Sequence, residues 1–182
     1  MKRRCTELLS KEHKIIIRMT DVLIAIAEES ERTSELNKPD VFGILEILRV
    51  IGDEYHQGKE EKALFPVFTR VCDRAELESV RHMLHEHEED RSLIAAMEDA
   101  VHRSNPADFA LHARLLADLQ RKHACKEDTV LFEIVNKSLS NADDQKVLAE
   151  FDAFDKAFKS QRHERLLHRL QMLEWKYMPV AA

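Results

Sequence analysis

Apolar residues recur at intervals of three, four and seven along most of the chain, which is the spacing of one buried helix face. Leu9, Ile16 and Leu23 show this spacing in the first stretch. Pro66 predicts a kink or a short break at the end of the second stretch, before Cys72. The pattern predicts four long helices, over residues 6–29, 39–65, 74–102 and 106–139.

Capping signals mark where these helices begin. Asp73 followed by Glu76 has the form of an N-terminal capping pair, and Asn105 followed by Pro106 is a strong start signal. Because the connections are short and polar, neighbouring helices must reverse direction. We therefore predict an all-α fold, an antiparallel up-down four-helix bundle over residues 1–140.

A fifth helical pattern follows a cap-like stretch at residues 141–144 and is predicted to be long or broken near Ser160. Its Phe151, Phe154 and Phe158 form one apolar stripe, which must be covered by the bundle or by a second chain. We expect residues 141–182 to be an additional C-terminal helix that docks through these rings. Its distal half is expected to contact a partner, as in a homodimer.

Composition narrows the class of protein. The 182 residues include only 3 Gly and 4 Pro, too few turn residues for a sandwich or barrel. A net charge of −6 argues against nucleic acid as a partner. The chain has no apolar run of membrane-spanning length and no signal-peptide core, so we expect a cytoplasmic protein without a membrane partner. Three cysteines without paired spacing are expected to be reduced thiols.

The chain has ten histidines, and the spacing His-x-x-x-Glu occurs twice. His56 precedes Glu60 by four residues on the second helix, and His123 precedes Glu127 by four on the fourth. Such pairs are common on solvated helix faces, but both of these lie on the apolar stripe of their helix. The two pairs are therefore predicted to face the core.

Each remaining helix of the bundle also carries one histidine on its apolar face, His13 on the first and His87 on the third. His85 has Arg81, Glu88 and Glu89 as helical neighbours, so it is expected to face solvent. At about 1.5 Å of rise per residue, the four inward histidines lie at similar distances from the turns that join their helices. They are predicted to form one layer across the bundle.

Four imidazoles and two carboxylates in an apolar core are costly unless they are paired or bind a metal. Imidazole nitrogen with carboxylate oxygen suits iron, manganese or zinc, and carboxylates from facing helices suit a two-metal centre. We therefore predict a metal site; a polar core held by mutual hydrogen bonds is the alternative. The predicted ligands are His13, His56, Glu60, His87, His123 and Glu127.

The same segments resemble the hemerythrin-like family, also called the HHE cation-binding domain. The resemblance covers about residues 6–137 and rests on Glu12-His13, the run from His56 to Pro66, Glu86-His87 and the run from His123 to Phe132. It implies an oxo- or hydroxo-bridged di-iron site. Glu60 and Glu127 would bridge the metals, with His13 and His56 on one iron and His87 and His123 on the other.

The sequence departs from the oxygen-carrying members at two positions. They have a further histidine four residues before the one matched by His87, where this chain has Met83, and an aspartate bridge where it has Glu127. The resemblance therefore implies a sensing or stress-response protein that binds oxygen, nitric oxide or iron. The alternatives are a di-iron enzyme reducing oxygen or peroxide, and a structural helical adaptor.

Other polar residues are expected to have packing or surface roles. His112 lies about 16 Å from His123 along one helix face, too far to share a metal. Tyr55 and Cys125 adjoin predicted ligands but face away from them, because adjacent helical residues point in different directions. His163 and His168 lie beyond the resemblance, and an acidic solvated face is expected for Glu61, Glu88 and Glu89.

Overall fold

A computed structural model describes residues 4–158 and 161–178, and every regular element in these ranges is helical. The prediction of an all-α fold is therefore confirmed. Four long rods, each built from one or more consecutive segments, precede α7 and α8, and π-helical segments are labelled η. The elements are α1 (Cys5–Thr33); α2 (Lys38–Ile47), η1 (Leu48–Gln57), η2 (Glu60–Leu64) and α3 (Phe65–Phe68); α4 (Arg74–His102); α5 (Pro106–Lys126), η3 (Glu127–Leu131) and α6 (Phe132–Ser138); α7 (Asn141–Phe158); and α8 (Gln161–Tyr177).

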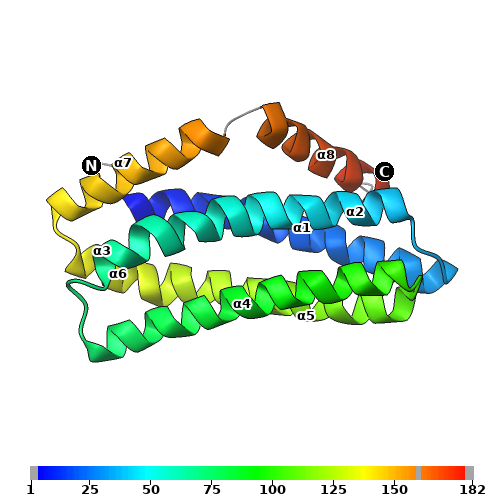
Figure 1. Ribbon diagram of the computed structural model, residues 1–182, viewed down its shortest axis with the longest axis horizontal. Coiled ribbons are helices and arrows are strands. Elements are labelled where there is room, and N and C mark those ends of the chain that lie inside the picture. Colours follow the sequence, from blue (N-terminus) through cyan, green and yellow to red (C-terminus); the bar gives the residue numbers. More distant parts are fainter. Residues whose placement is uncertain (1–3, 159–160, 179–182) are drawn as a thin grey trace.

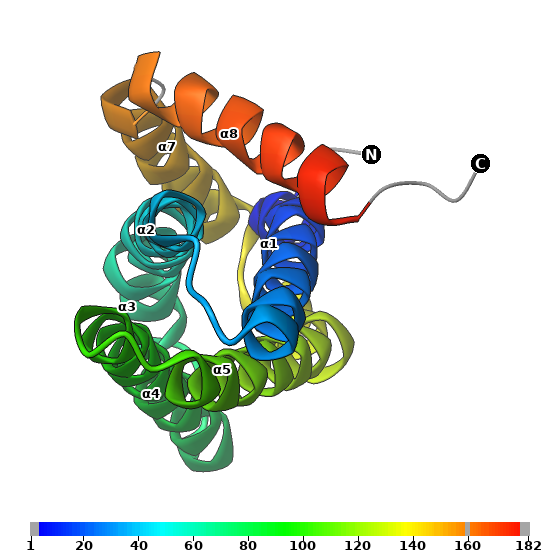
Figure 2. The ribbon, with the colours of Figure 1, turned by 90° about the vertical axis from the view of Figure 1, so that its right-hand side faces the viewer.

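The rods lie side by side as a helical bundle (Figure 1), and end-on they surround a common interior. Figure 2 shows α1, α2, α4 and α5 around this interior, with α7 and α8 outside it. Contacts join α1 to α5, α4 to α5, and both α1 and α4 to the rod that contains α2 and η1. The bundle thus places one face of each rod toward the same interior.

Ion pairs between the rods define their relative directions. Along α1, Asp21 pairs with Arg121 at 2.6 Å and Glu31 pairs with Arg114, while His13 contacts Glu127. As the residue number rises on α1, it falls on the rod of α5 and η3. These two rods therefore run in opposite directions.

The cap predictions at the two best-marked helix starts are confirmed. Asp73 accepts hydrogen bonds from the backbone of Ala75 and Glu76, and the Glu76 side chain accepts from the backbone of Asp73. Asn105 accepts from the backbone of Asp108. At α7 the capping side chain is Ser140, which accepts from the backbone of Asp143 at 3.2 Å, so the cap precedes the predicted stretch by one residue.

π-helical turns interrupt two of the rods at the predicted ligand positions. His56 lies in η1, Glu60 begins η2 and Glu127 begins η3. A π-turn widens the helix locally and is often found at functional sites. Pro66 lies in the first turn of α3, where its missing N–H is tolerated, and the rod ends at Phe68.

Two apolar clusters fill the bundle, one on each side of the predicted ligands. On α1, Leu9 belongs to one cluster and Ile16 to the other, with His13 between them. The same alternation is seen on α4, where His87 lies between Met83 and Ile94. The predicted layer of polar groups is therefore enclosed by apolar packing from both ends.

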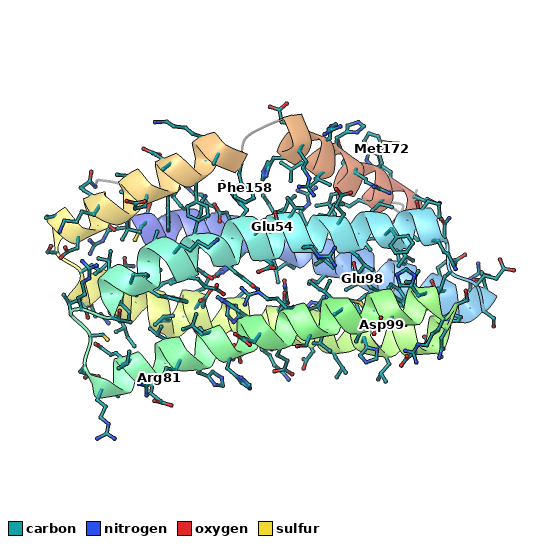
Figure 3. The ribbon with its side chains drawn as sticks, in the orientation of Figure 1. Glu54, Arg81, Glu98, Asp99, Phe158 and Met172 are labelled. Carbon is teal, nitrogen blue, oxygen red and sulfur yellow. The ribbon has the colours of Figure 1, made fainter. Side chains whose placement is uncertain are left out.

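The C-terminal segment is two helices rather than one long helix. In the described residues α7 ends at Phe158 and α8 begins at Gln161, and the predicted break at Ser160 falls outside the described residues. Phe151 is buried, and Figure 3 shows Phe158 at the end of α7 on the side that faces the bundle. Because the segment changes direction, α8 also packs on the bundle, burying Leu166, Leu170 and Leu173.

Some apolar side chains of α8 stay exposed. Met172 lies on the outer side of α8 (Figure 3) and is 48% exposed, and Trp175 is 64% exposed. Within the part of the chain that is described, no helix combines the length and apolar character needed to cross a bilayer. The three cysteines are free thiols.

Candidate metal centre

The structure brings the six predicted ligands together in the interior of the bundle. All six are buried, and none exceeds 8% exposure. The imidazoles form two close pairs: the ring centres of His13 and His56 are 4.8 Å apart, and those of His87 and His123 are 4.9 Å apart. The four histidines, which the sequence predicted at similar depths in the bundle, therefore lie in one layer.

Two carboxylates lie between the imidazole pairs. Glu60 Oε1 is 3.5 Å from His56 Nε2, and its Oε2 is 3.4 Å from His87 Nε2. Glu127 Oε2 is 3.1 Å from His13 Nε2 and 3.4 Å from His123 Nε2. Each carboxylate thus touches one imidazole of each pair, as a bridging ligand must.

These contacts define two four-residue clusters whose donor atoms lie within 4.8 Å of one another. Each cluster has two imidazoles and two carboxylates, a donor set that iron, manganese and zinc accept. The clusters share both carboxylates. Their members are His13, His56, Glu60 and Glu127 in one, and Glu60, His87, His123 and Glu127 in the other.

Hydrogen bonding among the described residues leaves this cluster incomplete. No standard hydrogen bond in the described part of the chain reaches His56 Nε2, Glu127 Oε1 or either carboxylate oxygen of Glu60. Buried polar atoms nearly always have a partner, and a carboxylate without one is especially costly. These orphaned atoms point into the same layer, so the residues fit bound metal and disfavour a self-sufficient polar core.

A ring of outer carboxylates surrounds the imidazoles. Each imidazole directs its Nδ1 to a carboxylate of another rod, and that carboxylate is the immediate sequence neighbour of a different predicted ligand. Such partners fix the tautomer and orientation of a metal-binding imidazole. The pairs are Glu12 with His56 at 3.0 Å, Glu61 with His87 at 2.8 Å, Glu86 with His123 at 2.9 Å and Asp128 with His13 at 3.0 Å.

The ring follows the order of the chain. The carboxylate of each rod bonds to the histidine of the next rod along the chain. The carboxylate of the fourth rod bonds to the histidine of the first, which completes the ring. The interpretation of Glu61 as part of a solvated face was therefore wrong: it bonds to His87 and to Arg91. The acidic neighbours of the ligands, as in Glu12-His13 and Glu127-Asp128, were the available signal.

Carboxylates dominate the electrostatics of the centre. Burial lowers the pKa of His13, but hydrogen bonds to Asp128 and Glu127 raise it to about 9. Burial likewise lowers the pKa of His87, and Glu60 and Glu61 raise it to about 9. The carboxylates therefore favour positive charge in this layer, whether it is carried by protons or by a metal cation.

The outer carboxylates are themselves held as anions. Burial raises the pKa of Glu86, but hydrogen bonds from His123 and Lys126 bring it down to about 2. Burial raises the pKa of Glu61, and hydrogen bonds from His87 and Arg91 bring it to about 2. An ionised outer carboxylate accepts the Nδ1 proton of the imidazole and leaves Nε2 free to bind a metal.

A second buried polar group adjoins the imidazoles and was not predicted. Asp90 is 2% exposed and accepts hydrogen bonds from Gln120 at 2.6 Å and from Gln57 at 3.4 Å. These three residues line a cavity of about 10 Å³ together with all four histidines. The cavity adjoins the candidate metal layer and has room for about one water-sized molecule.

The other residues considered from the sequence fall outside the centre. His85 is exposed as predicted, and so are Glu88 and Glu89. His112 bonds to the backbone carbonyl of Asp108. Tyr55 directs its hydroxyl to Asp155 on α7, Cys125 is exposed, and His163 packs on the ring of Tyr55. His168 is exposed, and Met83 is buried in the apolar cluster next to the layer.

Comparison with known proteins agrees with this geometry. The model of the hemerythrin HHE cation-binding domain matches residues 5–135, which include the six predicted ligands and the four outer carboxylates. Because the match spans well over half of the chain, the protein belongs to the hemerythrin HHE cation-binding family. Neither the curated proteins nor the solved structures include a match to this chain.

Proposed function

We propose that the protein holds two iron ions and binds or senses oxygen, nitric oxide or iron. The observation that carries this proposal is the pair of His/Glu clusters that share both Glu60 and Glu127. In this assignment His13 and His56 would hold one ion, His87 and His123 would hold the other, and Glu60 and Glu127 would be shared between them. The rods then correspond to the antiparallel four-helix bundle of a hemerythrin-like protein.

Bound iron would supply a redox-active centre that takes up a small diatomic ligand. The residues of the chain supply the rest. The outer carboxylates hold the imidazoles in place, the apolar clusters exclude bulk water, and the cavity beside Asp90 limits the ligand to a few atoms. Changed stability of the bundle when the ligand binds would provide the output of a sensor.

Metal analysis of the freshly purified protein, combined with an absorption spectrum, tests this proposal. Two iron ions per chain with an iron-dependent spectrum support it. Zinc and manganese accept the same ligands, so finding either in place of iron would change the metal and keep the site. A protein that contains no metal and takes up none would instead favour a structural adaptor.

The polar lining of the cavity favours an enzyme as the second candidate. The side-chain carbonyl oxygens of Gln57 and Gln120 are buried and accept no hydrogen bond from the described residues. Such oxygens suit a ligand that donates O–H groups, as hydrogen peroxide does. Repeated turnover of peroxide or oxygen with an added reductant would favour the enzyme, whereas reversible uptake of one equivalent would favour the sensor.

We also propose that Met83 keeps one coordination position open. It lies one helical turn before His87 and is buried, and a thioether is a poor ligand for oxidised iron. In a folded Met83→His protein the added imidazole is expected to change the absorption spectrum and to weaken azide binding. An unchanged spectrum with unchanged azide binding would place the open position elsewhere.

We propose a cytoplasmic protein that does not use nucleic acid or membranes as partners.

We also propose that the protein forms a homodimer through α8. Trp175 supports the dimer, because it remains exposed on a helix whose leucine face is already buried. Light scattering should show a dimer for the full chain and a monomer for Trp175→Glu. Leu111→Glu, which changes an exposed leucine of α5, is the control and should stay dimeric. A monomeric full chain would refute the dimer.

A further inference from the structure

Lys59 is a buried cation between η1 and η2, one residue before Glu60. Its side chain is 2% exposed. The ammonium lies 2.7 Å from Glu12 Oε1 on α1 and 2.9 Å from Asp155 Oδ1 on α7. Because a buried ammonium is stable only when it is paired, these two carboxylates determine where it lies.

Glu12 connects this cation to the candidate metal centre. One of its oxygens binds Lys59, and the other lies 3.0 Å from His56 Nδ1. A continuous series of charged contacts therefore runs from Asp155 through Lys59 and Glu12 to His56. Asp155 is held in turn by the hydroxyl of Tyr55, which donates to it at 2.5 Å.

The other three outer carboxylates are anchored within the bundle itself. Ser10 bonds to Asp128, Arg91 to Glu61 and Lys126 to Glu86. The side chains of Arg91 and Lys126 are 36% and 37% exposed, so water can replace part of what they contribute. Glu12 differs from these three carboxylates, because Lys59, which pairs with it, also pairs with Asp155 of the C-terminal segment.

We propose that Asp155 is a positioning residue for the metal centre, acting through Lys59 and Glu12 on His56. The inference rests on the proposed metal-binding function and goes beyond it, because α7 lies outside the residues matched to the family. The C-terminal extension then completes one half of the centre. Binding of metal by His13 and His56 and docking of α7 stabilise each other.

Titration of the full-length, metal-free protein with Co²⁺ alone tests this proposal. Wild-type protein should bind two ions. In Asp155→Ala, one ion should bind up to about 10-fold more weakly, the lower end of the range found when direct partners of metal ligands are removed, because Asp155 acts through Lys59 and Glu12. The other ion should bind as in wild type. Asp155→Asn should show a smaller loss in the same direction, and Asp155→Glu should restore part of the affinity.

Asp152→Ala is the matched control, because Asp152 is an exposed carboxylate on the same helix. Its isotherm should equal that of wild type. Equal isotherms for the Asp155 and Asp152 variants would overturn the proposal, and so would equal weakening of both ions, which indicates general destabilisation. Wild-type protein that binds no Co²⁺ would refute the proposed metal function, whereas two tightly bound ions in folded Asp155→Asn would refute only the role of Asp155.

Discussion

Glu127→Ala is expected to remove both metal ions, whereas His56→Ala is expected to remove one. Glu127 belongs to both clusters of donor atoms, and His56 belongs to one of them. Loss of Glu127 also leaves His13 and His123 without the carboxylate that lies 3.1 Å and 3.4 Å from them. Breaking buried ion pairs of this kind typically destabilises a protein by about 3 to 5 kcal/mol.

Metal content per chain and thermal unfolding measure these two effects. His85→Ala is the matched control, since this histidine is exposed and lies two residues from His87 on the same helix. Its metal content and melting temperature should equal those of wild type. Metal loss in His85→Ala as large as in His56→Ala would show that the ligands on α4 have been assigned wrongly.

Removing the metal from the wild-type protein is expected to lower its melting temperature substantially. Without metal, neither carboxylate oxygen of Glu60 accepts a standard hydrogen bond from the described residues, and its contacts with His56 and His87 are long, at 3.5 Å and 3.4 Å, so the folded state bears part of its desolvation cost. A ligand present at a thousandfold excess over its Kd stabilises the folded state by about 4 kcal/mol. For a chain of this size that corresponds to about 8 to 16 °C.

Calorimetry before and after chelation, and again after Fe²⁺ is returned, provides the measurement. Adding Mg²⁺ is the control, because it prefers oxygen ligands and should not replace a metal held by imidazoles. Equal melting temperatures for the chelated and the iron-loaded protein would contradict the assignment of these residues to a metal site.

The sequence by itself determined the helices and the inner layer. Helical periodicity assigned His13, His56, His87 and His123 to the inner faces, and the rise per residue placed them at one depth. Both quantities follow from the geometry of a single helix. That is why the bounds of α4 and the burial of the predicted ligands could be stated before the structure was known.

Only the tertiary structure decided which groups complete the layer. Glu61 and Asp128 reach imidazoles on neighbouring rods, and Lys59 reaches a carboxylate on α7. Such contacts depend on the distance and rotation between helices, which periodicity within one helix does not contain. The π-turns that contain Glu60 and Glu127 also escaped the sequence pattern, because a single wide turn shifts the apolar spacing by too little to be seen.

The path of the C-terminal segment was likewise decided by tertiary packing. Its sequence supports helix on both sides of residue 160, and the apolar stripes of α7 and α8 could each cover this bundle or another chain. The change of direction between them lets Phe151 and Leu170 both reach the bundle. A residue pattern shows which face of a helix must be buried, and the surface that buries it is known only when the other helices are in place.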